Sequence, residues 1–210
     1  TRFAIGQKDR LAGNEFVMTG GRNGEVRLLN ADPDRLEAIA AWLMAQPEVS
    51  HVFSHGRDAV QGTVPGTFAF EVVDNHHPRQ PDLAFVLNAD DKEDAYGLPG
   101  EGLMTPGDVP LGGGMHGGLH RGELNTVLVV GVPGLDARGS VTERPAGLID
   151  IGPTVLDLLG VPAASSMKGV SLARPARAEP VYRTLFAERP GFIQSIDVVD
   201  HDGRRFIVGG

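Results

Sequence analysis

Short apolar runs, separated by Gly, Pro and acidic residues, predict most of the regular structure of this chain. Residues 25–29 (EVRLL) and 49–53 have the length and composition of strands. Between them, apolar residues recur at helical spacing after Asp32, a residue type that caps helices, and stop before Pro47. We therefore expect a β-α-β unit over residues 25–53.

Three further apolar runs predict strands. They are Phe68–Val73, Asp82–Leu87 and Thr126–Val132, and the last of these (TVLVVGV) has the β-branched, uncharged composition of a buried strand. The acidic, Gly- and Pro-rich residues 88–111 predict a long loop, which in a compact domain is usually functional or mobile.

A second helix is expected after Asp150, whose carboxylate we interpret as a structural cap and not as a metal ligand. Gly160 and Pro162 end this helix, and four apolar side chains are expected to pack it: Val155, Leu156, Leu158 and Leu159. Asp157 is expected to point outward.

Asp202-Gly203 between two apolar runs predicts a terminal hairpin over residues 190–210. The expected fold class is therefore α/β, with a mixed sheet, flanking helices, long Gly/Pro-rich loops and a C-terminal β-hairpin.

The main candidate for chemistry is His116, which lies among five glycines of the segment GGGMHGG, residues 112–118. Glycines permit positive φ angles and close approach of the backbone to a ligand, and a bound metal or anion is one way to hold such a loop. From spacing alone, a metal ligand and a histidine bonded to a backbone carbonyl are equally good readings. His120 follows four residues later, but the glycines between them argue against a helical metal pair.

The strings GGGMHGGLHRGELNTVLVVGVPG, IDIGPTVLDLLGVP and MKGVSL, with PDLAFVLNADD and AYGLPG upstream, resemble the alkaline phosphatase superfamily. Within it, the chain is most similar to the C-terminal half of the type I phosphodiesterase/nucleotide pyrophosphatase branch, over roughly residues 20 to 172. The resemblance implies that residues 1–210 are the C-terminal portion of an alkaline-phosphatase-like domain. Residues 112–160 would be its metal loop, strand and helix.

The resemblance also implies zinc, with two ions in the full-length enzyme and His116 as a ligand of one. The family's nucleophilic Thr or Ser, its first aspartate and an Asp-His-Gly segment belong to an N-terminal half, and none occurs here. The nearest string, Asp200-His201-Asp202, lies at the opposite end of the chain. We therefore expect an excised piece of a longer enzyme, inactive by itself, with His120 facing the substrate or supporting a ligand.

The remaining clusters are weaker candidates. Asp74, His76 and His77 are interpreted as loop residues, because adjacent side chains on an extended backbone point to opposite sides. The acidic residues 90–94 follow a predicted strand, where α/β proteins place ligands, but charge runs are usually solvated. His51 and His55, at the end of a strand, receive no role.

Composition narrows the class of partner. A net charge of −8 argues against nucleic acid, and no apolar run is long enough to span a membrane. Without cysteine, any metal must be held by His, Asp or Glu. The expected partner is a small-molecule phosphoester substrate. Two alternatives stay open: a non-catalytic α/β binding or interaction domain, and a related phosphomutase or sulfatase.

Overall fold

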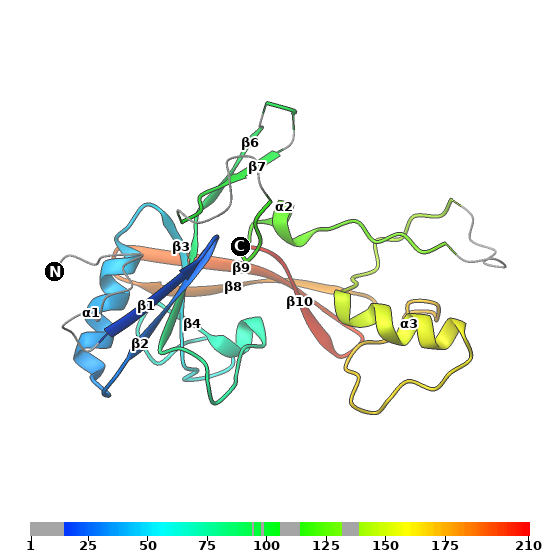
Figure 1. The fold of residues 1–210 in the computed structure, drawn as a ribbon, viewed down its shortest axis with the longest axis horizontal. Helices are drawn as coiled ribbons and strands as arrows, with labels where there is room; N and C mark the ends of the chain where they lie inside the picture. The colour runs from blue at the N-terminus through cyan, green and yellow to red at the C-terminus, as the bar shows by residue number, and fades with distance from the viewer. Residues whose placement is uncertain (1–14, 94, 98, 106–113, 132–138) are drawn as a thin grey trace. The chain divides into compact units, whose positions relative to one another are not determined.

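The computed structural model describes residues 15–93, 95–97, 99–105, 114–131 and 139–210 (Figure 1). Its internal contacts divide the chain into two compact units. Unit 1 takes the residues up to Thr126, Thr184–Ile196 and Val208–Gly210, and unit 2 takes Val127–Arg183 and Asp197–Ile207. Each unit is described by itself below.

Unit 1 contains a five-stranded mixed sheet in the order β1-β2-β5-β3-β4. Neighbouring strands are antiparallel except for the pair β3 and β4, which is parallel. The bounds of the strands are β1 Glu15–Gly20, β2 Asn23–Leu28, β3 Val49–Ser54, β4 Phe68–Ala69 and β5 Leu83–Leu87. The expected mixed sheet is therefore present, and with the helices of the chain it confirms the mixed α/β class.

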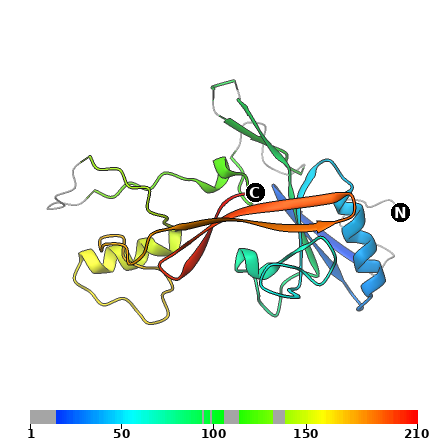
Figure 2. The same cartoon turned by 180° about the vertical axis from the view of Figure 1, so that it is seen from behind.

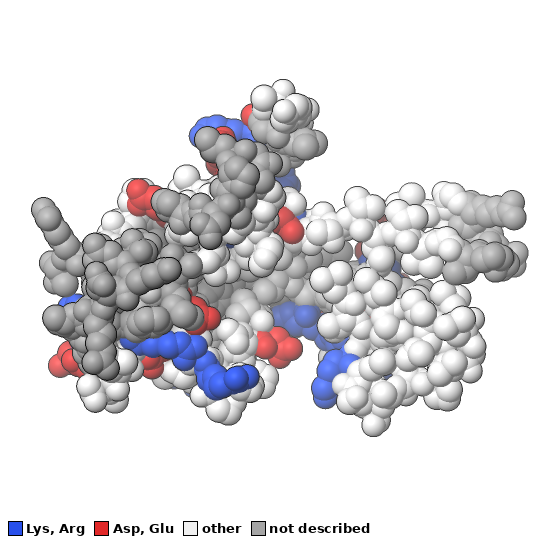
Figure 3. Space-filling view, in the orientation of Figure 1, with Lys and Arg blue, Asp and Glu red and all other residues white. Residues whose placement is uncertain are grey.

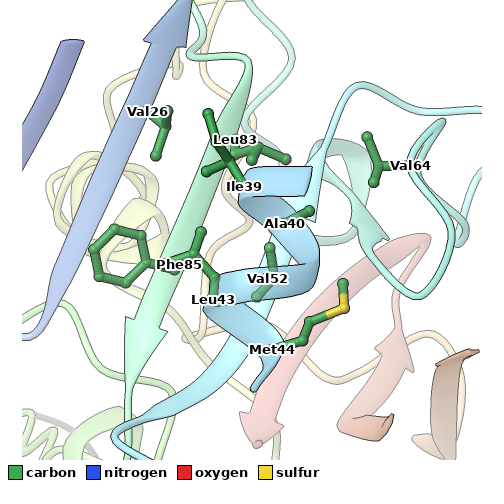
Figure 4. Close-up of a cluster of buried hydrophobic side chains, with 9 residues drawn as sticks. All are labelled: Val26, Ile39, Ala40, Leu43, Met44, Val52, Val64, Leu83 and Phe85. Atoms are coloured by element: carbon green, nitrogen blue, oxygen red, sulfur yellow. The ribbon is translucent and has the colours of Figure 1, made fainter. Parts of the chain in front are cut away.

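Helix α1, Pro33–Met44, covers this sheet as its sequence predicts. The Asp32 carboxylate accepts a hydrogen bond from the Arg35 N–H at 2.9 Å, and Pro33 begins the first turn, where its missing N–H has no cost. The buried side of the helix packs on strand residues of the sheet (Figure 4) in a core of Val26, Ile39, Ala40, Leu43, Met44, Val52, Val64, Leu83 and Phe85. The elements of the expected β-α-β unit are all present, with β5 inserted between β2 and β3.

Two expectations in unit 1 need correction. The strand expected over Phe68–Val73 stops at Ala69 and continues as a 3-10 helix, Phe70–Val73. Phe68, Phe70 and Val72 are all buried, so their spacing reflects packing in the core and not a longer ladder. The expected loop 88–111 contains a two-stranded sheet of β6, Ala89–Glu93, and β7, Pro99–Gly102. Backbone pairing forms it although its charged residues are poor strand formers.

In unit 2, the predicted helix is present as α3, Ile151–Leu158, preceded by a short 3-10 turn, Leu148–Asp150. Gly160 ends it with φ +69°. The Val161 N–H donates to the Leu156 carbonyl at 2.8 Å and the Gly160 N–H to the Asp157 carbonyl at 3.0 Å, which is the Schellman arrangement. The expected packing of this helix is wrong for three side chains, because Val155, Leu158 and Leu159 are exposed.

The strand expected at Thr126–Val132 is also wrong for the residues described. Residues 126–131 have no regular secondary structure, and Val132 lies outside the described residues. The side chains of Val127 and Val129 are 88% and 82% exposed. A strand exists only where another strand accepts its backbone hydrogen bonds, and no described strand pairs with this segment.

The C-terminal hairpin is confirmed as β9, Phe192–His201, and β10, Arg204–Gly209. Asp202 and Gly203 take φ +50° and +75°, as a two-residue hairpin turn requires. Strand β8, Val181–Arg189, which the sequence analysis did not predict, completes a three-stranded sheet in the order β10-β9-β8 (Figure 2). Among the residues described, no helix has the length and apolar character needed to cross a bilayer.

Candidate functional site

His116 lies in an irregular segment of unit 1, Gly114–Leu119, and its side chain is exposed. Gly117 takes φ +101°, so the left-handed backbone expected of this glycine-rich loop is present directly after the histidine. Gly112 and Gly113 lie outside the described residues. The imidazole is thus presented to solvent beside a backbone kink that a larger residue would resist.

The protein itself holds the described part of the loop. The Asn23 side-chain amide donates to the Gly117 carbonyl at 3.1 Å. Met115 lies so close to Gly21 that a Cβ there would be 1.8 Å from its Cε atom. A Cβ on Gly118 would meet the Glu123 carboxylate at 2.0 Å. Close packing against small residues therefore fixes the loop without any ligand.

Arg22, which the sequence analysis did not single out, connects this loop to the sheet. Its side chain is 4% exposed and lies in the turn between β1 and β2. It donates to both carboxylate oxygens of Glu123, at 2.7 and 2.8 Å, and to the carbonyl oxygens of Asn88, at 3.0 Å, and Leu103. The Arg22 hydrogen bonds hold the pKa of Glu123 below its ordinary value. No motif marks Arg22, because its partners are distant in sequence.

His120 begins the short helix α2, Arg121–Leu124. Its Nδ1 accepts from the Gly122 N–H at 3.2 Å, which leaves the proton on Nε2, 3.2 Å from the Asp91 carboxylate. Both ring nitrogens are therefore occupied, and the histidine serves as a helix cap tied to the β6–β7 hairpin. A metal at His120 would have to displace one of these contacts.

Three further histidines of unit 1 make contacts that suit structural roles. His77 Nδ1 accepts from the Arg79 N–H at 3.1 Å, and His76 lies 3.7 Å from the Asp74 carboxylate, with both side chains exposed. His51 is buried in β3, where its Nε2 donates to the Ser195 carbonyl at 2.8 Å, and burial lowers its pKa. These contacts match the interpretation of 74–77 as loop residues and give His51 a structural role.

In the acidic run, Asp91 contacts His120 and Asp90 pairs with Lys92. Glu93 is exposed, and Asp94 lies outside the described residues. Of the carboxylates that follow the strand, Asp91 alone is shown to reach the neighbourhood of His120. The first carboxylates after the strand are thus engaged by His120 and Lys92.

The two aspartates of α3 are structural, in a different way from that expected. Asp150 is fully buried, and its carboxylate accepts from the N–H groups of Gly147, at 3.0 Å, and Val170, at 2.8 Å, and pairs with Arg204. It caps no N–H of α3. Asp157 does not point freely outward, because it pairs with Arg174.

Among the described residues, no group of three or more His, Asp or Glu side chains could hold a metal ion. Zinc in proteins takes three or four protein ligands, so His116 fits a zinc centre as one ligand of a set that the described part of this chain does not complete. Comparison with models of protein families, with curated proteins and with solved structures finds no match to this chain.

Proposed function

We propose that this chain is the C-terminal part of a zinc-dependent hydrolase of phosphate esters, similar to the phosphodiesterase/nucleotide pyrophosphatase branch. His116 would contribute one imidazole to one of two zinc ions. The observation that carries the proposal is the exposed position of His116 on a loop that close packing holds in place. A ligand that must meet an ion shared with other residues needs both accessibility and a fixed backbone.

If this chain is the C-terminal part of a longer protein, it should have a surface against which a further polypeptide segment packs. Unit 2 offers such a surface. The extended residues 127–131 and the apolar side of α3 are exposed together. In the view of Figure 3, the face of unit 2 that carries α3 presents few charged side chains. Exposed apolar side chains, where they form a contiguous patch, mark an interaction site, so we propose that a further segment covers them.

The chemistry that zinc supplies when bound is activation of an oxygen nucleophile and stabilisation of charge on the phosphoryl group. This chain holds none of the family's nucleophile or Asp-His-Gly residues. Its contribution is to present His116, with Arg22, Glu123 and Asn23 fixing the loop. We expect no hydrolysis of bis(p-nitrophenyl) phosphate by this chain alone.

The sequence encoded immediately before Thr1 is the first test. An aspartate, a Thr or Ser nucleophile and an Asp-His-Gly segment there support the enzyme. A start codon directly before Thr1 would instead favour the alternative of a non-catalytic α/β binding domain. Phosphodiester, phosphomonoester and sulfate ester substrates, offered to the completed protein, distinguish a phosphodiesterase from a phosphomutase or sulfatase.

A zinc titration tests His116 itself. We expect weak zinc binding to the 210-residue chain, measured by calorimetric titration, and its loss in His116→Ala. The matched control is His77→Ala, which removes another exposed loop imidazole. In the completed protein, His116→Ala should lower hydrolysis by about 100-fold or more. Equal and tight zinc binding by the chain and its His116→Ala variant would refute the assignment.

A further inference from the structure

A cavity of about 320 Å³ opens in unit 2, next to α3, the connector after it and the β9–β10 turn. This volume is at the lower end of the range for small-molecule sites. Three arginines and two aspartates line it, so its formal charge is +1: Arg144, Asp157, Arg174, Arg177 and Asp202. The charge of the cavity therefore favours an anion.

The first aspartate is already saturated by protein donors. Asp157 accepts from the Ser171 hydroxyl at 2.6 Å and from Arg174 Nε at 2.9 Å, and a second Arg174 nitrogen donates to its other oxygen. These hydrogen bonds lower the pKa of Asp157 to about 2. Asp157 is therefore charged at neutral pH, and two of the three Arg174 nitrogens donate to it.

The second aspartate is saturated as well. Asp202 accepts from the backbone N–H groups of Arg177, at 2.9 Å, and Ala178, at 3.2 Å, through one oxygen. Its other oxygen accepts from Arg144 Nη2 at 3.1 Å. The backbone N–H groups stabilise part of the negative charge of Asp202, so the carboxylate neutralises the neighbouring arginines less completely.

Donors without acceptors lie at the same place. Arg144 Nε is buried and has no hydrogen-bond partner within the described part of the chain. The Arg177 side chain is exposed, and no hydrogen bond joins its guanidinium to another described residue. A buried donor without an acceptor costs about 1–3 kcal/mol, so Arg144 Nε favours a bound acceptor. The Arg177 guanidinium is exposed and is free to donate to an anion in the cavity.

We propose that this cavity binds the phosphate group of a small molecule, with Arg144 Nε and the Arg177 guanidinium as donors. Arginine presents several N–H groups in a fixed plane that matches the oxygens of phosphate. The site lies wholly in unit 2 and involves neither His116 nor zinc. It is therefore an additional site, and it does not depend on the proposed hydrolase activity.

Calorimetric titration of the 210-residue chain with inorganic phosphate, in buffer containing EDTA, tests the proposal. EDTA removes zinc, so phosphate held by a metal at His116 would be lost while binding in the cavity persists. Arg177→Gln should weaken phosphate binding by about tenfold, the effect of one charge-assisted contact. Arg177→Lys keeps the charge but loses the planar donor set, so its affinity for phosphate should lie between those of the unsubstituted chain and Arg177→Gln.

The matched control is Arg79→Gln, which removes an exposed arginine of unit 1 and should leave phosphate binding unchanged. Glycerol 3-phosphate distinguishes two sources of the same group: tighter binding than inorganic phosphate assigns the site to phosphoesters, and weaker binding assigns it to free phosphate. The proposal is overturned if phosphate does not bind in EDTA, or if Arg177→Gln and Arg79→Gln bind it equally well. Neither result affects the zinc titration of His116, so the two proposals fail separately.

Discussion

Replacing Arg22 by Met should destabilise unit 1 strongly and disorder the loop that carries His116. The substitution keeps the length and apolar part of the side chain but removes every donor. Two groups then lose their partner: the Glu123 carboxylate, which is 22% exposed, and the carbonyl oxygen of Leu103. The Asn88 carbonyl loses one of two donors and keeps the Leu103 N–H at 2.9 Å. Asn88 directly follows β5, and Leu103 directly follows β7, so the loss spreads over two sheets.

The expected loss of stability is about 3–5 kcal/mol, the range for removing one partner of a buried ion pair. The unsatisfied carbonyl oxygen of Leu103 contributes to it, at about 1 kcal/mol or more where water does not reach it. Because Glu123 is partly exposed, water can solvate its carboxylate once Arg22 is removed. We therefore expect a loss of stability in the lower part of this range. A denaturant slope of about 2 kcal/mol per M of urea converts the loss into a midpoint lower by roughly 1.5–2 M.

Urea unfolding followed by tryptophan fluorescence measures this loss, because Trp42 in α1 is the single tryptophan of the chain and reports on unit 1. Arg121→Met is the control, since that arginine is 70% exposed and should change stability by less than about 0.5 kcal/mol. A double-mutant cycle with Glu123→Gln should give a coupling of about 1–3 kcal/mol. A loss below 1 kcal/mol, or one equal to that of the control, would refute the role given to Arg22.

The same pair has a pH signature. Arg22 lowers the pKa of Glu123, so the stability that the pair supplies is complete above the carboxyl's ordinary value of 4.5 and is lost as the pH falls through the lowered value. In Arg22→Met, unfolding measured between pH 6 and pH 3 should lack this component.

Three further outcomes are expected. The Asp157 carboxyl should titrate near pH 2 by NMR and move toward 3.8 in Arg174→Gln, so its contribution to stability is lost only below the ordinary pKa. Val129→Thr, at an exposed position, should change stability by less than about 0.5 kcal/mol, whereas Leu83→Ala in the core should cost about 2–5 kcal/mol in urea unfolding. Gly203→Ala should cost about 1–2 kcal/mol in thermal unfolding, because φ is +75° and no atom within 4 Å could offset the strain.

Local signals were sufficient for the elements that depend on local physics. Asp32 and Pro33 begin α1, Gly160 ends α3, and Asp202-Gly203 turns the final hairpin, all through conformations that these residue types favour by themselves. Such features could be predicted because the competing conformations are limited within a few residues.

The environment of the candidate site could not be predicted in this way. Arg22 contacts groups 66, 81 and 101 residues away in sequence, and nothing in the string GGRNG indicates which carbonyl or carboxylate will reach it. The partner of His120, Asp91, was counted only as part of a charge run, because the β6–β7 hairpin that brings it close has no strand-like composition. His116 could be singled out only because its glycine neighbours are local.

Residues 126–131 show why a strong strand pattern can still fail. The run TVLVVG has the composition of a buried strand, yet its valines are exposed and no described strand pairs with it. The composition of a segment indicates the environment in which it is most stable. For this run that environment is a paired strand with apolar side chains packed on it. The same holds for Val155, Leu158 and Leu159 on α3, whose helical stripe is correct in period but uncovered. A shared lack of cover among the described residues of unit 2 agrees with our proposal that a further polypeptide segment packs there.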